Sequence, residues 1–203
     1  MLSGVRPCQR APSSGRRAKL APLAVLGAAL SLNLLGCPAP APGTAQPGNL
    51  PAYSGHATDL FDDVIEPAAV GLELDQGSPP GADATLRERT QVADSVLRLK
   101  MVSYTSKNED TGTTYSITLR AVEVLAGKPQ VADLTVVVGK DNPSAGLLKS
   151  RADGLVQKQV PFVGFVRAFA QPDGDAETHF HLSPDSADVV KAVRDAAAQQ
   201  ELR

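Results

Sequence analysis

The chain has 203 residues, of which 42% are hydrophobic and only 4% aromatic, and its 20 Lys+Arg nearly balance 22 Asp+Glu. This length accommodates one medium-sized domain with accessory segments and excludes a large multidomain enzyme. Both cysteines, Cys8 and Cys37, lie near the N-terminus. The rest of the chain therefore has no disulfide framework, zinc ribbon or redox CxxC site.

Residues 1–36 have the composition of a secretory signal peptide. A basic segment precedes an uncharged, largely apolar stretch over residues 20–36. This order of a basic and then an apolar segment is typical of an export signal. The basic residues are Arg6, Arg10, Arg16, Arg17 and Lys19.

The apolar stretch ends in the tetrapeptide Leu34-Leu35-Gly36-Cys37, which resembles the lipobox of bacterial lipoproteins. The resemblance implies that signal peptidase II cleaves between Gly36 and Cys37, that the Cys37 sulfur carries diacylglycerol, and that the new amino group is acylated, for example with palmitate. Two or three acyl chains on one residue hold a protein stably on a membrane. Because Pro38 rather than aspartate follows the cysteine, the resemblance favours the outer membrane of a Gram-negative bacterium, facing either the periplasm or the outside.

Cleavage after Gly36 would make the exported chain acidic. Five of the 20 Lys+Arg would leave with the signal, so that 15 would remain against 22 Asp+Glu. A protein of this charge repels phosphate backbones, so we expect no nucleic-acid partner. The alternative to cleavage is an uncleaved N-terminal anchor with an incidental cysteine.

Two accessory segments are expected between the signal and the main domain. Residues 37–55 are rich in proline and form an extended, polyproline-like tether. Residues 56–91 are expected to pack on the domain as a short helix over 58–66, ended by Pro67, followed by a loop. Near the start of that helix, Asp62 and Asp63 are expected to complement the helix dipole rather than to form a metal or acid/base site.

The hydrophobic pattern of residues 92–203 predicts a β-rich domain with a C-terminal helix. A change of apolar phase in the second strand predicts a β-bulge near Arg120 and Ala121. The strand at 160–170 is apolar at both parities, as expected for burial on both faces. A short helical piece is predicted over 143–151, and a last helix over 184–199 with Ser183 as its cap. The predicted strands cover 97–101, 115–124, 134–138, 160–170 and 177–182.

The predicted fold class is mainly β, or α+β. Three strands, a helix and two strands follow one another over residues 92–182, and this order resembles the five-stranded oligonucleotide/oligosaccharide-binding (OB) barrel in strand number and in the position of its helix. The resemblance rests on topology alone. An open antiparallel sandwich is the alternative architecture.

The sequence His179-Phe180-His181 is the sharpest candidate for a ligand site. Alternate residues of a strand project to one face, so the two imidazoles would lie side by side while Phe180 faces the core. Neutral imidazoles ligate zinc or copper, and Glu177 lies on the same strand face as a third ligand. The alternative is a solvated histidine pair on an exposed strand face. Further ligands, if the fold brings them close, would be Asp173, Asp175 and His56.

The chain contains none of the GxSxG, HExxH, SxxK, P-loop or GxGxxG signatures, so we expect a non-enzymatic protein with no catalytic residues and no obligatory cofactor. The leading hypothesis is a membrane-anchored envelope lipoprotein that serves as an interaction or assembly module for another envelope protein. The alternative hypothesis is a lipoprotein that binds a metal or a small ligand through His179 and His181.

Overall fold

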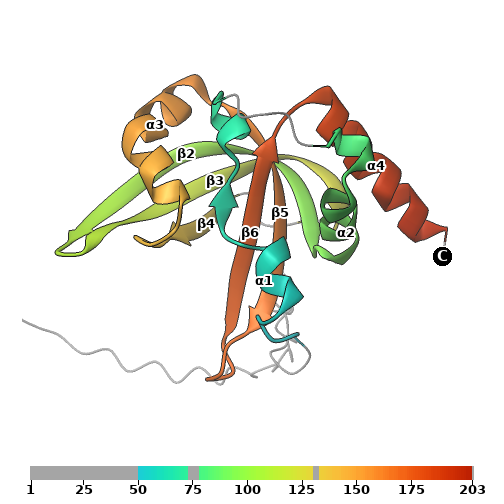
Figure 1. Ribbon diagram of the computed structural model, residues 1–203, viewed down its shortest axis with the longest axis horizontal. Helices are drawn as coiled ribbons and strands as arrows, with labels where there is room; N and C mark the ends of the chain where they lie inside the picture. Colours follow the sequence, from blue (N-terminus) through green and yellow to red (C-terminus); the bar gives the residue numbers. More distant parts are fainter. Residues whose placement is uncertain (1–49, 73–77, 130–132, 203) are drawn as a thin grey trace, which may run out of the picture. The chain divides into compact units, whose positions relative to one another are not determined.

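The computed structural model describes residues 50–72, 78–129 and 133–202. The predicted signal peptide, the lipobox residues Gly36 and Cys37, and most of the tether lie outside these residues. The described part is mainly β, with one curled sheet and flanking helices (Figure 1). Among the described residues, no helix combines the length and the apolar character that crossing a membrane requires.

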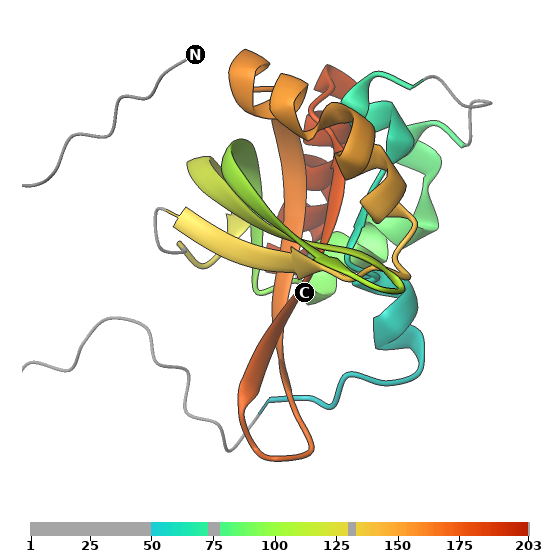
Figure 2. The same ribbon diagram turned by 90° about the vertical axis from the view of Figure 1, so that its left-hand side faces the viewer.

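The sheet has six strands in the order β1-β6-β5-β2-β3-β4. Neighbouring strands are antiparallel, except that β1 pairs in parallel with β6. Figures 1 and 2 both place the tip of the β5–β6 hairpin at the end of the sheet opposite to helix α3 (Ser144–Lys158). The strands are β1 (Val64–Ile65), β2 (Ser95–Glu109), β3 (Gly112–Gly127), β4 (Asp133–Val138), β5 (Pro161–Ala170) and β6 (Ala176–Pro184).

Helices cover the sheet and create two hydrophobic cores. Alternate residues of β5 belong to different cores: Phe162 and Val166 to the core that includes α3, and Val163 and Phe165 to the core that includes α2 and α4. The predicted burial of this strand on both faces is therefore confirmed. The helices are α1 (His56–Leu60), α2 (Ala84–Val92), α3 (Ser144–Lys158) and α4 (Ala187–Glu201), with 3-10 turns η2 (Pro67–Val70) and η3 (Pro80–Ala82).

The long hairpin of β2 and β3 contains the predicted bulge. Arg98 pairs with Glu123 and Leu99 pairs with Ala121, so Val122 is the extra residue of β3. The bulge lies next to the predicted position. It leaves Val122 about half exposed, at 49%, because the extra residue changes which side chains of β3 face the core.

The N-terminal part of the domain differs from the prediction. The sheet has six strands rather than five, because β1 occupies the second half of the helix predicted over 58–66. Helix α1 ends at Leu60, so Asp62 and Asp63 follow the helix and do not complement the dipole at its start. Their position beside β1 brings them to the candidate site.

The two C-terminal helices also differ from their predicted bounds. Helix α3 extends to Lys158, well beyond the short piece predicted over 143–151. Helix α4 starts three residues later than predicted, because Pro184 is the last residue of β6 and Ser186 is the N-cap that accepts a hydrogen bond from the backbone N–H of Val189. The predicted apolar stripe of α4 is confirmed by the burial of Val189, Val190 and Val193.

Candidate functional site

Residues 51–66, which we call the strap, form the N-terminal segment of the domain and lie along β6. Its backbone is bonded to the sheet at both ends: Pro51 accepts from the N–H of Ala170, and the N–H of Glu66 donates to Leu182, each at 2.9 Å. Figure 1 shows the strap passing through α1 and then β1 beside β6. The strap therefore runs along the edge of β6, and its side chains contact the two histidines of that strand.

His181 is held between two carboxylates of the strap. Its Nδ1 lies 2.7 Å from Asp62 Oδ1 and its Nε2 lies 2.7 Å from Glu66 Oε1. Ser183 also donates to Glu66 Oε1, at 2.7 Å. Burial alone would lower the pKa of His181, but the hydrogen bonds to Asp62 and Glu66 raise it above its ordinary value. Because a carboxylate only accepts, both ring nitrogens act as donors in the imidazolium form.

His179 has a different environment on its two ring nitrogens. Its Nδ1 lies 2.7 Å from Asp63 Oδ2, whereas the buried Nε2 has no hydrogen-bond partner among the described residues. The nearest carboxylate oxygen recorded for Nε2 is Oε2 of Glu177, at 3.4 Å. Burial would lower the pKa of His179, but the hydrogen bond to Asp63 and the negative charges of Asp63 and Glu177 raise it.

Tyr53 of the strap covers the ring of His179. The two ring centroids are 3.4 Å apart and the planes are inclined by 9°, so the rings are stacked. The Tyr53 hydroxyl donates to the carbonyl of Phe61. Burial, followed by the charge of Asp63, raises the pKa of Tyr53 to about 12, so that the phenol remains a donor at physiological pH.

Asp63 adopts an uncommon backbone conformation that places its carboxylate over β6. Its φ is 55°, in the left-handed region that aspartate tolerates better than most residues. One carboxylate oxygen accepts from the backbone N–H of Phe180 at 3.0 Å, and the other contacts His179. Asn142 stabilises this turn by donating to the Asp63 carbonyl at 3.1 Å. A sparsely populated conformation that is fixed by several contacts is typical of a functional or strongly constrained position.

The cluster carries an excess of negative charge that one buried arginine offsets in part. Arg89 is 6% exposed; its Nε donates to the carbonyl of Leu60 at 2.6 Å and its guanidinium lies over the ring of Phe165. Burial would raise the pKa of Asp62 and of Glu66, but His181 and the charge of Arg89 help to lower both below their ordinary values. Asp62 and Glu66 therefore favour their charged form. The carboxylates of the cluster are those of Asp62, Asp63, Glu66 and Glu177.

The predicted site residues are brought together only in part. His179 and His181 share one face while Phe180 faces the core, as predicted, but the alternative of a solvated pair on an exposed face is wrong because both histidines are buried. Glu177 lies close to His179, and no contact of Glu177 with His181 is found among the described residues. Within the described residues, no group of three or more His, Cys, Asp and Glu side chains is arranged to hold a metal ion.

The other predicted ligands have local partners elsewhere. His56 Nε2 lies 3.0 Å from Glu88 of α2. Asp173 and Asp175 belong to the β5–β6 turn, where the Asp173 carboxylate accepts from the backbone N–H of Asp175. Sequence reasoning missed the strap residues of the cluster. Their signal was the acidic pair Asp62 and Asp63, shortly before Pro67.

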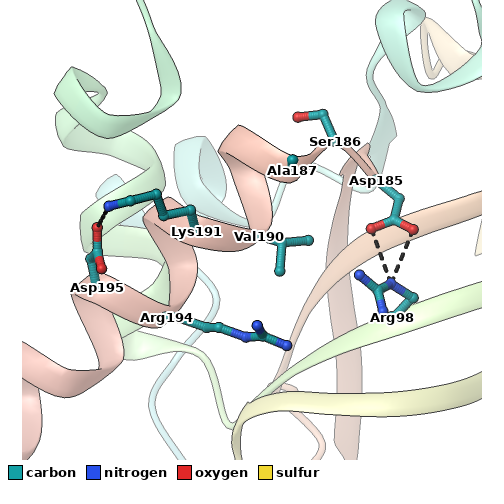
Figure 3. A pocket seen from close by; sticks show the side chains of 8 residues that line it. All are labelled: Arg98, Asp185, Ser186, Ala187, Val190, Lys191, Arg194 and Asp195. Atoms are coloured by element: carbon teal, nitrogen blue, oxygen red, sulfur yellow. Dashed lines mark hydrogen bonds and ion pairs between the residues drawn. The ribbon is translucent and has the colours of Figure 1, made fainter.

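A separate pocket of about 500 Å³ lies between the N-terminal half of α4, the residues that precede it, and Arg98 of β2. Figure 3 shows Arg98 directed at Asp185 and Lys191 directed at Asp195; the two contacts measure 3.0 Å and 2.6 Å. The third cationic side chain, Arg194, pairs with Glu123, which also contacts Arg98. Each cationic side chain of this pocket is therefore paired with a carboxylate, and the pair of Arg194 with Glu123 joins α4 to β3.

Comparisons with known proteins identify no relative. No protein-family model matches the chain, and neither the curated proteins nor the solved structures contain a match. The histidine–carboxylate cluster and the N-terminal tetrapeptide are therefore the features on which a functional proposal rests.

Proposed function

We propose that this protein is an exported lipoprotein of the outer membrane, anchored through lipid on Cys37, whose folded part is a non-enzymatic interaction or assembly module of the envelope. The observation that carries the proposal is the tetrapeptide Leu34-Leu35-Gly36-Cys37 at the end of an uncharged stretch that follows a basic segment. Signal peptidase II requires its cleavage site at this place in the signal.

The attachment of the strap supports this proposal. A proline-rich tether would lead from Cys37 to Pro51, where the strap begins its contacts with the sheet. Because the strap is bonded to the sheet by backbone and side-chain contacts, an anchor at Cys37 would pull on the folded part through an ordered segment. A module that presents one surface to a partner near a membrane benefits from such a fixed point of attachment.

We also propose that residues 92–182 form an opened OB-like barrel. The five long strands β2 to β6 and the position of α3 between β4 and β5 support this assignment. The short strand β1 adds a sixth strand at the edge beside β6. In this arrangement the strap occupies the outer edge of the sheet.

Lipidation is tested by mass spectrometry of the protein recovered from membranes of an expressing Gram-negative bacterium. The wild type and the matched control Cys8→Ser are expected to begin at Cys37 and to carry acyl chains. The variant Cys37→Ser is expected to accumulate as the uncleaved precursor without lipid. Equal processing of Cys37→Ser and the wild type would contradict a lipid anchor at this residue.

The assembly role is tested by cross-linking in cells, followed by purification of the intact protein in mild detergent. We expect an envelope protein to be recovered in a stoichiometric amount with the wild type. Recovery of a lipidated protein alone, at several cross-linker lengths, would reject the assembly role while leaving the lipid anchor in place.

A further inference from the structure

The two histidines of β6 differ in one respect that points to a binding site. His181 has a carboxylate oxygen at 2.7 Å from each ring nitrogen, so both nitrogens are satisfied. His179 has such a partner on Nδ1 only, and its Nε2 is buried without a hydrogen bond among the described residues. A buried polar atom without a partner is uncommon in folded proteins, because it has lost its contact with water and gained no hydrogen bond in exchange.

We propose that His179 Nε2 and the carboxylate of Glu177 form a binding site for a divalent transition cation, such as Cu²⁺ or Zn²⁺, with water completing the coordination. This inference goes beyond the lipoprotein assignment and does not depend on it. In this proposal only His179 of the two histidines binds the cation, and Asp63 positions the His179 ring through its hydrogen bond to Nδ1.

The separation of the two ligand atoms fits a coordinated cation better than a hydrogen bond. Nε2 of His179 and Oε2 of Glu177 are 3.4 Å apart. Two ligands at metal bond lengths of about 2.0–2.1 Å and a tetrahedral angle are separated by about 3.4 Å. The distance between these two atoms therefore matches that between two ligands of one cation.

The groups behind these ligands are those that metal sites commonly use. Asp63 accepts a hydrogen bond from Nδ1 of His179, which fixes the tautomer with its lone pair on Nε2 and increases the basicity of the ring. Gln171 donates to Glu177 Oε2 at 2.7 Å and fixes the second ligand. Tyr53, stacked on the imidazole, prevents the ring from rotating out of this position.

The local charge also favours a cation. The carboxylates of Asp62, Asp63, Glu66 and Glu177 surround the two rings, and the positive charges of Arg89 and of the His181 imidazolium oppose only part of their field. The side chain of Glu177 is 48% exposed, so a hydrated cation can reach it from solvent. On binding, the cation takes the Nε2 lone pair, and a proton bound there is released to solvent.

His181 is not part of the proposed site. A cation on either of its nitrogens would have to displace Asp62 or Glu66, and with them the contacts that fix the strap. The two histidines of the motif His179-Phe180-His181, which the sequence predicted as ligands of one metal ion, thus have different roles in this proposal. His181 fixes the strap, and His179 is left with one nitrogen for a ligand.

The test uses the full-length protein, carrying Cys8→Ser and purified in detergent, titrated with Cu²⁺ and Zn²⁺ near pH 8. The chain has only three histidines, so electron paramagnetic resonance of bound Cu²⁺ can count and assign its nitrogen ligands. We expect one bound ion with one imidazole nitrogen, and a dissociation constant tighter than about 100 μM by calorimetry. Sulfur ligation through Cys37 would give a different spectrum.

Three variants assign the ligands. Glu177→Gln, at a half-exposed position, and His179→Gln are each expected to weaken binding at least tenfold, whereas His56→Gln is the matched control and should bind as the wild type does. Glu177→Gln keeps the test decisive if His179→Gln fails to fold. The proposal is rejected if no ion binds more tightly than about 100 μM, if Glu177→Gln binds unchanged, or if only His56→Gln loses binding. None of these results depends on the lipid at Cys37.

Discussion

The carboxylate of Asp62 and Nδ1 of His181 lie 2.7 Å apart, although 119 residues separate them in the sequence. The contact joins the strap, near the start of the described domain, to β6, the last strand in the sequence. It therefore links two segments that lie near opposite ends of the described chain. Because the imidazole is buried and the acid is charged, this hydrogen bond belongs to the stronger, charge-assisted kind. The stability of the domain should therefore depend on it.

The first prediction concerns this pair. The variant Asp62→Asn is expected to lower the free energy of unfolding by about 1–3 kcal/mol, because it leaves a buried imidazolium without one of its two charged partners. Asp59→Asn is the control on the same segment; Asp59 is 77% exposed and lies 3.6 Å from His56, so a change within about 0.5 kcal/mol is expected. Urea unfolding measures both. Equal losses in the two variants would contradict a special contribution of the Asp62–His181 contact.

The second prediction is a pH dependence of stability with two limbs. The pKa of His181 is raised above its ordinary value of 6.5, so its contribution is complete below that pH and is lost as the pH rises through the folded pKa. The pKa values of Asp62 and Glu66 are lowered from 3.8 and 4.5, so their contributions are present above these values and are lost as the pH falls through the folded pKa. Stability should therefore be greatest between about pH 4.5 and 6.5.

Urea midpoints measured from pH 3 to 9 test this dependence. The double variant Asp62→Asn/Glu66→Gln is expected to flatten both limbs, because it removes the groups that shift the pKa of His181. His56→Gln should change the curve much less, since the contacts of His56 are exposed and screened by solvent. A curve of unchanged shape in the double variant would mean that other groups set the pH dependence.

The long strands could be predicted from the sequence because their signals are local. The alternation of Leu97, Leu99 and Met101, and the apolar parity of β5, record which side chains face a core. Strand β1 had no such signal. Its two residues, Val64 and Ile65, are extended because they pair in parallel with His181 and Leu182, and a helical pattern of apolar residues ending at a proline equally predicted a helix.

The sequence predicted that the two histidines lie side by side, but it did not predict which residues contact them. The spacing of His179 and His181 fixes their common face, since alternate residues of any strand share a face. The partners of the histidines come from a segment far away in the chain, and a single sequence carries no record of that pairing. The acidic residues of the strap could be noticed, but their contacts depend on the path of the chain after α1.

A third prediction concerns the end of β3, where Gly127 is required. Its φ is 78°, and a Cβ built there would lie 2.3 Å from the backbone oxygen of Asp94. The variant Gly127→Ala is expected to lose about 1–3 kcal/mol, because neither the backbone conformation nor the neighbouring carbonyl can adapt cheaply. Gly154→Ala in α3, where a Cβ meets open space, is expected to gain about 0.4–1 kcal/mol. Thermal unfolding of the two variants should show midpoint shifts of opposite sign.

The last prediction separates the two contributions of Tyr53. Tyr53→Phe keeps the stack on His179 and removes the hydrogen bond to Phe61, so a loss of about 0.5–1.5 kcal/mol is expected. Tyr53→Leu also removes the aromatic stack and is expected to lose a further 0.5–1.5 kcal/mol or so. The control Tyr104→Phe removes an exposed hydrogen bond to Asp153 and should change stability by no more than about 0.5 kcal/mol.

These variants also test whether the stack positions the imidazole of His179. Tyr53→Leu should weaken Cu²⁺ binding, because the ring of His179 can then rotate away from Glu177, whereas Tyr53→Phe should bind as the wild type does. If both variants lose stability to the same extent, the contribution of Tyr53 lies in its hydroxyl rather than in the stack. If Tyr53→Phe alone weakened the binding of Cu²⁺, the hydrogen bond to Phe61 and not the ring would position His179.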